Sequence, residues 1–524
     1  MATDRRSLRV GIDVGGTNTD AVVLDADNNI LAWTKQPTSP DVTGGMRDAL
    51  ARVLEAIGDG ERQVGRVMLG TTHATNAILQ RRGLGRVGVI RLGAPATTAV
   101  PPLESWPHDL KATVAVDAVM VEGGHLIDGY PIAPLDRDAV RRFLGAVAGR
   151  VDAIAVTGVF SPAFSDQELE IAQIVREEFG PDHPVSMSHE IGSLGLLERE
   201  NATVLNAALY GVAGEVTRAL DAVLAERNLD VAPFFAQNDG TLMALEYAAR
   251  YPVLTIGSGP ANSIRGAAFL SGVEDAIVAD VGGTSTDLGV LVKGFPRESA
   301  AAVDIGGVRT NFRMPDILSL AIGGGTIVAG DPAAPQVGPQ SVGYRVVTEG
   351  LVFGGAVATL TDAAVLARRA EVGSQDPARA ARKLRQLLAA ALPAADARIV
   401  AAVDQVGLGK MDRPLVAVGG GAFLIPDEVP GVTEVLRPDR GDVANAVGAA
   451  IALVSGRWDT IAPAGDGRRK AIDEACEMAR RRAVQAGAAP DAVEIVELSE
   501  IPLSYLPEPA IRVHVKAAGP LGWL

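Results

Sequence analysis

The sequence has little of several features on which whole classes of protein depend. Its 524 residues include one cysteine, Cys476, and six histidines. The chain therefore has no internal disulfide framework and little scope for histidine-rich metal sites. Aromatic residues make up only 4% of the chain, which is too few for surfaces that stack nucleic-acid bases. The formal net charge of −15 argues against nucleic acid or an anionic membrane as the main partner.

Segments that would direct the chain into or across a membrane are also missing. No run of about 18 apolar residues occurs, so we expect no membrane span. Residues 1–10 lead into an apparent first strand and a glycine turn rather than into the apolar region of a signal peptide. We therefore expect a cytoplasmic protein without nucleic-acid or membrane partners.

Two common nucleotide-binding motifs are absent or out of context. Gly409-Lys410 is followed by Met411, and no G-x-x-x-x-G-K-[ST] string occurs, so a P-loop enzyme is not expected. Residues 83–88 match G-x-G-x-x-G. A helix-like run precedes them and a strand-like run follows, whereas the dinucleotide fingerprint needs strand before helix.

The composition that remains is that of a large globular protein. Hydrophobic residues make up 48% of the chain and charged residues 21%. A chain of this length exceeds what one hydrophobic core normally serves, so two or three domains are expected. Strand-like and helix-like runs alternate throughout, which is typical of an α/β architecture.

The most informative feature is an eight-residue string that occurs almost twice. Residues 13–20 read DVGGTNTD and residues 280–287 read DVGGTSTD. Each copy lies between two short apolar runs, which predicts a strand–turn–strand hairpin. Glycines let the backbone approach an anion, and successive N–H groups form a donor nest that suits phosphate. The alternative, an ordinary tight hairpin closed by Asp and Thr, is less favoured because the string occurs in both halves.

The hairpins supply the first candidate site residues. Asp13 and Asp280 stand at predicted strand ends, where a carboxylate can hold Mg²⁺, usually through water. We predict these two as catalytic and metal-binding residues. The predicted phosphate-binding residues of the two turns are Gly15, Gly16, Thr17, Asn18 and Thr19 in the first and Gly282, Gly283, Thr284, Ser285 and Thr286 in the second.

Further short strings extend the pattern along the chain. They are Gly70–Asn76 (GTTHATN), Glu198-Arg199, Thr203–Asn206 (TVLN), Ser258–Ala261 (SGPA) and Val418–Gly421 (VGGG). Together with the hairpins they resemble the ATP-binding A subunit of the hydantoinase/oxoprolinase family, within the actin-like ATPase superfamily. The matching strings lie in order across about the first 450 residues.

This resemblance implies a fold and a function. The fold would be the two-domain actin-like, ribonuclease H-like ATPase fold, with the nucleotide cleft between the halves and a small C-terminal α+β segment. The function would be ATP- and Mg²⁺-dependent opening of a cyclic amide of the hydantoin, 5-oxoproline or lactam type. The partner would be a hydantoinase B-like or other second subunit.

The resemblance also implies further site residues. At Gly419, Gly420 and Gly421 the backbone would run close to the adenine and ribose. Ser258 and Gly259 would contribute to nucleotide binding. His73 and Asn76 would lie near the phosphates or the substrate, although polar side chains at a helix start often only cap the helix.

One string departs from the family pattern D-x-H-T-x-G-A-G-G-G. Aligned on Gly323–Gly325, the chain keeps Asp316, has Leu318 in place of His and has Ser319 in place of Thr. Asp316 remains a candidate substrate residue. A leucine cannot coordinate a metal, so any contact made by that histidine in relatives is missing here.

The same patterns predict an organisation of the chain. We expect an N-terminal half over 1–195, a C-terminal half over 196–456 and a small extension over 457–524. A long helical run over 196–224 would join the halves, and a strand over 253–256 would precede Ser258. Residues 330–350 read as a loop, 443–455 as a helix at a domain interface, and 469–486 as a helix followed by strands at 493–497 and 511–516.

Two other functions share the same phosphate loops. A kinase for a free small molecule would release a stable phosphoester, and an ATP-gated reactivating protein would turn ATP over slowly. We find no hydrolytic constellation such as a G-x-S-x-G elbow beside the loops. A second subunit is therefore expected to complete the hydrolysis of the amide.

Overall fold

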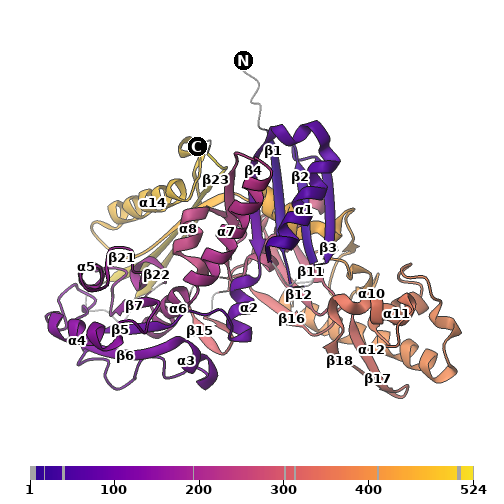
Figure 1. Cartoon of the computed structure of the whole chain (residues 1–524), viewed down its shortest axis with the longest axis horizontal. Coiled ribbons are helices and arrows are strands. Elements are labelled where there is room, and N and C mark those ends of the chain that lie inside the picture. The colour runs from indigo at the N-terminus through magenta and orange to yellow at the C-terminus, as the bar shows by residue number, and fades with distance from the viewer. Residues whose placement is uncertain are drawn as a thin grey trace.

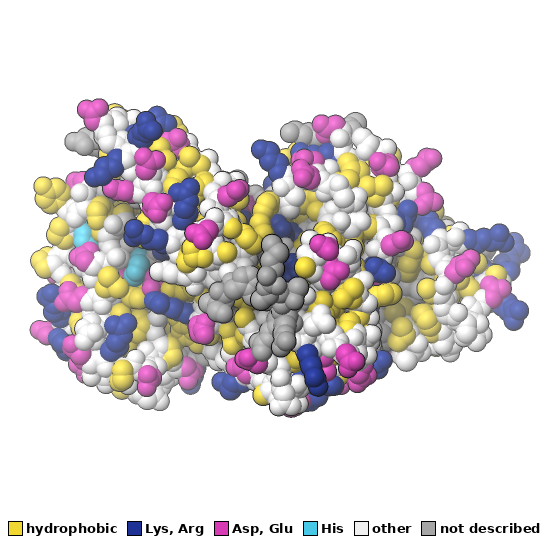
Figure 2. All heavy atoms as spheres, turned by 90° about the horizontal axis from the view of Figure 1, so that it is seen from above, with side chains coloured by type: hydrophobic (Ala, Val, Ile, Leu, Met, Phe, Trp, Pro, Cys, Tyr) yellow, Lys and Arg dark blue, Asp and Glu magenta, His cyan; other side chains and the backbone are white. Residues whose placement is uncertain are grey.

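The computed structural model describes residues 7–16, 18–37, 42–192, 194–299, 302–311, 314–409, 412–503 and 509–522. The molecule is a mixed α/β protein with two large sheets that meet near its centre and a smaller sheet to one side (Figure 1). Acidic and basic side chains are interspersed over the face seen in Figure 2.

The first sheet has nine strands in the order β22-β23-β21-β10-β9-β4-β1-β2-β3. Its strands are β1 (Leu8–Val14), β2 (Asn18–Leu24), β3 (Ile30–Pro37), β4 (Val64–Thr71), β9 (Ala232–Ala236), β10 (Leu242–Ala244), β21 (Val454–Pro463), β22 (Glu494–Leu503) and β23 (Ala510–Gly519). The helices α1 (Val42–Ile57), α7 (Tyr210–Glu226) and α14 (Arg468–Gln485) bury apolar side chains against it and form the largest core.

The C-terminal segment is part of this first sheet. Strand β21 pairs with β10 at Leu242 and Val454, and β23 pairs with β21 along ten residues, from Val454–Gly519 to Pro463–Ala510. The predicted division at 195 and 456 stays a prediction. Strands from the two sides of each boundary pair with one another. Local sequence patterns do not report such long-range pairing.

The second sheet contains the second copy of the repeat. Its order is β13-β12-β11-β19-β20, with β16 also paired to β12. The strands are β11 (Ala276–Val281), β12 (Thr286–Val292), β13 (Phe295–Pro296), β16 (Ile317–Leu320), β19 (Leu415–Val418) and β20 (Val435–Leu436). Helices α11 (Leu360–Leu366) and α12 (Arg382–Gly407) complete the second core.

Helix α12 is long and apolar enough to cross a membrane by length and composition. Its apolar residues, among them Leu388, Ala395 and Ile399, lie buried in the second core. Packing in that core accounts for the apolar composition of the helix.

The smaller sheet has the order β6-β5-β7-β8 and lies at the left of Figure 1. It comprises β5 (Val87–Ala94), β6 (Ala115–Glu122), β7 (Ala153–Gly158) and β8 (Val185–Met187). The helices of this region are α2 (His73–Gln80), α3 (His108–Val114), α4 (Arg137–Val147), α5 (Asp166–Phe179) and α6 (Leu196–Ala208), whereas α8 (Leu245–Arg250) packs against α7, β9 and β10 of the first sheet.

Several elements differ from the sequence-based expectation. The long helix over 196–224 is two helices, α6 and α7, joined at Leu209. Residues 253–256 are not a strand, because Pro252–Thr255 form a 3₁₀ turn. Within the expected loop 330–350, β17 (Thr326–Asp331) and β18 (Ala334–Ser341) form a hairpin, followed by the short helix α10 (Val346–Glu349). A further short hairpin joins β14 (Val303–Ile305) and β15 (Val308–Thr310).

Two helices cross between the large sheets. Helix α9 (Ser258–Ser271) precedes β11 and packs against the second sheet, whereas α13 (Ala444–Ile451) packs against β1 and β2. They touch through backbone: a Cβ added to Gly448 would lie 1.9 Å from the Asn262 carbonyl oxygen, and one added to Gly266 would lie 1.9 Å from that of Ala444. The helix predicted over 443–455 is found as α13, but it ends at Ile451, and β21 begins at Val454.

Candidate nucleotide cleft

The two copies of the repeat fold into matching hairpins. In the first, β1 and β2 are antiparallel and Asp13 stands opposite Asp20. In the second, β11 and β12 are antiparallel and Asp280 stands opposite Asp287. Both turns close in the same way: Gly15 N donates to the Asn18 carbonyl at 3.0 Å, and Gly282 N donates to the Ser285 carbonyl at 2.9 Å.

Each leading aspartate is placed beside a glycine of a neighbouring strand end. Asp13 pairs in parallel register with Gly70 of β4, where an added Cβ would lie 2.4 Å from Asp13 Oδ1. Asp280 pairs with Val418 of β19, and a Cβ on the next residue, Gly419, would lie 2.4 Å from Asp280 Oδ1. Gly419 also has φ +85°, a conformation that side chains with a Cβ rarely adopt. The two glycines therefore leave room for the carboxylates.

The hairpins face a common cleft with a cavity of about 230 Å³. Its walls come from both hairpins, from the turn after β19 and from the start of α13. The lining residues are Asp13, Gly15, Gly16, Asn18, Asp20, Lys35, Asp280, Gly282, Gly283, Thr284, Ser285, Asp287, Gly419, Gly420, Asp442 and Asn445.

Side chains from distant segments hold the aspartates in place. Lys35 on β3 donates to both carboxylate oxygens of Asp20, at 2.9 and 2.8 Å, and to the Asp442 carbonyl at 2.9 Å. Asn445 Nδ2 donates to Asp13 Oδ2 at 3.3 Å. On the second hairpin, Ser319 Oγ donates to Asp287 Oδ1 at 2.5 Å.

Burial makes the carboxylates of the cleft hard to ionise. It raises the pKa of Asp13 to about 7, and the neighbouring Asp20 charge adds to this rise. Burial raises the pKa of Asp20 to about 6 against the opposing effect of Lys35. The pKa of Asp287 is likewise raised to about 6, and that of Asp280 is also raised by burial. A bound cation would relieve this electrostatic cost.

The chemistry of these donors fits Mg²⁺ held with a nucleotide. Asp13 Oδ1 and both polar atoms of the Asn262 side chain are buried without a hydrogen-bond partner, which is unusual for native polar groups. Within the described part of the chain no three His, Cys, Asp or Glu side chains converge as a metal-binding group. Mg²⁺ suits such a site, because it keeps several waters and takes one or two carboxylates plus phosphate oxygens.

The glycine-rich string after Asp316 supports the second hairpin from behind. Gly324 N donates to the Gly282 carbonyl at 3.0 Å and Gly325 N to that of Gly283 at 2.7 Å. On β16, Ser319 reaches Asp287, whereas Leu318 packs against the second core. Leu318 is thus accommodated as a half-buried side chain at the edge of the second core.

The structure brings most, but not all, of the predicted residues to the cleft. Asp13, Asp280, both pairs of turn glycines, Asn18, Thr284, Ser285, Gly419 and Gly420 line it. Thr17 lies outside the described residues.

Other predicted nucleotide-binding residues lie outside the cleft lining. Thr19 and Thr286 are fully buried, because alternation along β2 and β12 turns them from the face that carries the aspartates. The Thr286 hydroxyl donates to the Ile322 carbonyl at 2.7 Å. Gly421 N donates to the Val281 carbonyl at 2.8 Å.

The remaining predicted residues also lie outside the lining of the cleft. Ser258 Oγ donates to the Thr71 carbonyl at 3.2 Å, and a Cβ added to Gly259 would lie 3.5 Å from the Thr72 methyl carbon. They place the first turn of α9 against β4.

The predicted substrate residues are dispersed. His73 Nδ1 lies 2.6 Å from Thr71 Oγ1 and faces α7 rather than the cleft. Asn76 Nδ2 donates to Thr72 Oγ1 at 3.3 Å and lies beside Gly16. Asp316 is ion-paired to Arg297 at 2.7 Å.

Sequence reasoning missed five residues that line the cleft, namely Asp20, Lys35, Asp287, Asp442 and Asn445. The two aspartates had a signal, because each ends the repeated string and a two-strand hairpin places its ends opposite one another. The other three come from separate segments, and no local pattern marks them.

Comparison with known families agrees with this geometry. The hydantoinase/oxoprolinase N-terminal region matches residues 9–179, and the hydantoinase/oxoprolinase family proper matches residues 199–457. The chain belongs to the hydantoinase/oxoprolinase family. The family recognition drawn from the repeated hairpins and the shorter strings is confirmed.

Two curated relatives of this family member are subunits of named enzymes. The caprolactamase subunit alpha of Pseudomonas jessenii is 28% identical over 68% of this chain and 54% of its own length. The acetophenone carboxylase gamma subunit of Aromatoleum aromaticum is 27% identical over 68% of this chain and 52% of its own. The chain thus matches about half the length of these relatives.

Solved structures support the predicted fold. The crystal structure of the ATP-dependent caprolactamase from Pseudomonas jessenii aligns with a TM-score of 0.78 at 21% identity, over 98% of this chain and 89% of that chain. Nucleotide-free acetone carboxylase aligns with a TM-score of 0.71 at 17% identity, over 98% and 88%. The actin-like fold inferred from the paired hairpins is confirmed.

Proposed function

We propose that this protein is the ATP-using subunit of an enzyme that opens a cyclic amide. The observation that carries the proposal is the facing pair of Asp-Val-Gly-Gly hairpins, with Asp13 and Asp280 lining one cleft. Two backbone turns rich in N–H donors suit the phosphates of a nucleotide held between them. The likeness to the caprolactamase subunit alpha supports a cyclic amide as the substrate class.

The residues of the cleft would have different roles in phosphoryl transfer. The Gly15 and Gly282 N–H groups close the two turns, so Gly16 and Gly283 would present backbone donors to the phosphates, and Asp13 and Asp280 would hold Mg²⁺ directly or through water. When bound, Mg²⁺ supplies positive charge that neutralises the transferring phosphoryl group. Since phosphoryl transfer depends mainly on positioning and charge neutralisation, these groups suffice for activation.

Activation explains why ATP is needed to open a stable ring. The amide oxygen would attack the terminal phosphorus of ATP, so that a phosphorus–oxygen bond forms and ADP leaves. The resulting O-phosphorylated amide has lost the resonance that protects its C–N bond. One water would then add to the activated carbon and expel the protonated ring nitrogen, which leaves an acyl phosphate, and a second water would release inorganic phosphate and the ring-opened carboxylate.

The first test is binding of the nucleotide. Mg²⁺–ATP or Mg²⁺–ADP should raise the melting temperature, because the ligand binds the folded state. Asp13→Asn and Asp280→Asn should each abolish most of the rise. Asp48→Asn, on the exposed face of α1, serves as the matched control and should keep it. Folded protein that shows no shift with any adenine nucleotide would rule the proposal out.

The second test concerns the partner. Within the part of the chain that the structure describes, we find no hydrolytic group beside the hairpins, so the chain alone should open hydantoins and lactams poorly. A hydantoinase B-like second subunit should raise the rate of ring opening several-fold or more. Full-rate ring opening by the single chain would contradict this dependence. A stable phosphorylated alcohol would instead identify a small-molecule kinase.

A carboxylase subunit is the second candidate, because two relatives carry carboxylase names. The same cleft could activate a carbonyl oxygen or bicarbonate by phosphorylation. ATP hydrolysis that depends on a ketone and bicarbonate, and not on any cyclic amide, would favour this candidate.

A further inference from the structure

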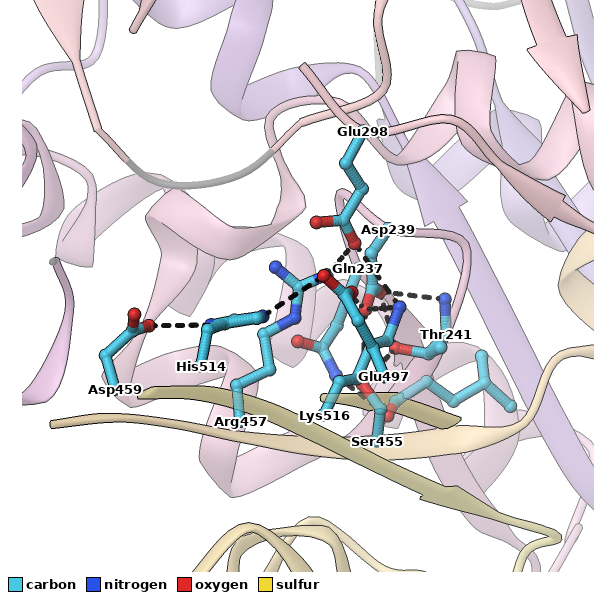
Figure 3. A network of polar contacts seen from close by, with 11 residues as sticks. Gln237, Asp239, Thr241, Glu298, Ser455, Arg457, Asp459, Glu497, His514 and Lys516 are labelled. Atoms are coloured by element: carbon cyan, nitrogen blue, oxygen red, sulfur yellow. Dashed lines mark hydrogen bonds and ion pairs between the residues drawn. The ribbon is translucent and has the colours of Figure 1, made fainter. Parts of the chain in front are cut away.

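A second cavity, of about 250 Å³, lies away from the nucleotide cleft. Its walls come from three parts of the chain: the segment 162–192 beside the smaller sheet, residues 237–254, and the C-terminal strands β21 and β23 with α14. None of its lining residues lines the nucleotide cleft. Figure 3 shows a polar network to which several of its lining residues belong, among them Asp239, Arg457 and His514.

The carboxylates of this network already have cationic partners. Asp239 accepts from Lys516 at 2.8 Å and from Arg457 at 2.9 Å. Asp459 lies 3.0 Å from both Arg512 and His514. Since these acids are paired, the cavity offers little attraction to a further cation.

Among the described residues, one cation that lines the cavity has no ion-paired carboxylate. Arg482 of α14 donates to the Arg457 carbonyl at 3.1 Å and lies over the Trp458 ring, 4.6 Å from its centroid. Among the described residues, no carboxylate forms an ion pair with it. Of the cations that line the cavity, Arg482 is thus one whose guanidinium has no ion-paired carboxylate among the described residues.

One nitrogen of a buried imidazole that lines the same cavity lacks a hydrogen-bond partner. His514 is 1% exposed, and its Nδ1 faces Asp459. Its Nε2 is buried without a hydrogen bond and lies 3.8 Å from Glu497 Oε1. An unsatisfied buried polar atom is rare in native proteins and often marks an absent ligand or water.

The opposite wall carries a second histidine in a fixed orientation. His189 Nδ1 lies 2.6 Å from Glu168 Oε2, and Glu168 is fully buried. The same carboxylate accepts from the Ser188 hydroxyl at 2.6 Å and from Gly158 N at 2.7 Å. The Ile191 and Leu254 side chains supply apolar surface nearby.

We propose that this cavity is a small-molecule site separate from the nucleotide cleft, and that it binds a small organic carboxylate with Arg482 as the charge partner. A single negative charge balances the Arg482 guanidinium, and the apolar wall accepts a short carbon chain. An arginine held in place by stacking forms strong hydrogen bonds to a carboxylate. The proposal goes beyond the ATP-dependent function and does not rest on it.

The test measures binding of pentanoate and of its uncharged isostere pentanamide to the whole chain, by ligand-observed NMR or calorimetry without nucleotide. Pentanoate should bind at least about tenfold more tightly than pentanamide, because charge-assisted hydrogen bonds contribute about 1.5–3 kcal/mol. Arg482→Gln should weaken pentanoate binding about tenfold. Arg481→Gln, the exposed neighbour on α14, is the matched control and should change it less than about twofold.

Folding is checked by the melting temperature of each variant without ligand. Should Arg482→Gln fail to fold, Arg482→Lys decides, since it keeps the charge but loses the planar fork and should bind several-fold more weakly. Equal binding of the two probes, no binding at about 50 mM, or equal losses in both glutamine variants would overturn the proposal. The Mg²⁺–ATP shift should persist in Arg482→Gln, which separates this proposal from the proposed function.

Discussion

The residues of the nucleotide cleft form a cluster of acids with few cations. Asp13, Asp20, Asp280 and Asp287 line it, and Lys35 is the only basic side chain among the described lining residues. Each hairpin contributes two of these acids because its leading and trailing aspartates are paired across the strands. The free protein thus holds buried carboxylates without full compensation.

This cluster predicts a pH dependence in the absence of divalent ions. The folded pKa of Asp13 is about 7, above the unfolded value of about 3.9. Between these values the folded protein keeps a proton that the unfolded chain has lost, so stability falls as pH rises from about 4 to about 7. Asp20 and Asp287, with pKa values near about 6, act in the same direction.

Asp13→Asn should therefore stabilise the free protein at pH 7.5 by up to a few kcal/mol. The gain should shrink towards pH 4.5, and the same variant should lose the Mg²⁺–ATP shift. Melting curves in EDTA at several pH values measure both effects, with Asp48→Asn as the control. A pH-independent difference, or a loss of stability at pH 7.5, would contradict this assignment.

Among the residues of the cleft, the repeated string predicted the two leading aspartates, Asp13 and Asp280. The trailing aspartates could also have been read from it, since both ends of a short hairpin meet. Lys35, Asp442 and Asn445 could not, because their places depend on how β3 and α13 pack against the hairpins. His73 stays a prediction: it lies outside the cleft lining and near α7, and in a sequence a polar residue at a helix start looks the same whether it faces a ligand or a neighbouring helix.

Among the elements, the crossing of α9 and α13 sets how the two large sheets meet. Helix α13 carries Asn445, which holds Asp13, and α9 carries Asn262 beside the same carboxylate. Backbone contact at Gly266 and Gly448 sets the close spacing between these two helices.

Gly448→Ala should therefore destabilise the protein by about 1–3 kcal/mol or more, because its Cβ would lie 1.9 Å from a backbone oxygen that cannot move freely. The variant should also weaken the Mg²⁺–ATP shift. Gly145→Ala in α4, where a Cβ meets nothing within 4 Å, should leave stability unchanged or raise it. Thermal melting of both variants tests the prediction, and equal melting temperatures would refute it.

Local patterns predicted many elements and missed others for identifiable reasons. The interface helix and α14 were predicted because small or apolar residues recur at helical spacing. The hairpin β17–β18 was missed because its proline and glycine content resembles a loop. The strand predicted over 253–256 is a 3₁₀ turn, because a short apolar run carries no clear period that would distinguish the two.

For the whole molecule, the main finding is that the two ends of the chain build one sheet. Strand β21 follows α13 directly and pairs with β10, and β23 and β22 extend the sheet from it. Val513 and Val515 of β23 are fully buried in the largest core. The C-terminal segment is thus a structural part of the first sheet.

A chain that ends at Leu453 should consequently be insoluble, or melt many degrees below the full chain. The truncation removes three strands and leaves the β10 edge and its apolar neighbours exposed. Solubility, size-exclusion profile and melting temperature measure the effect. A monodisperse truncated protein with an unchanged melting temperature would show that the segment is dispensable.

The continuity of that sheet also has a consequence for biosynthesis. While the ribosome is still translating the chain, β10 has no partner on one side until residues beyond 454 have emerged. The cleft, which needs Asn445, is likewise incomplete until late in synthesis. While the residues between β10 and β21 are being synthesised, the nascent chain therefore exposes an unpaired strand edge that cannot yet be protected by nucleotide, and this interval is when chaperones would be most needed.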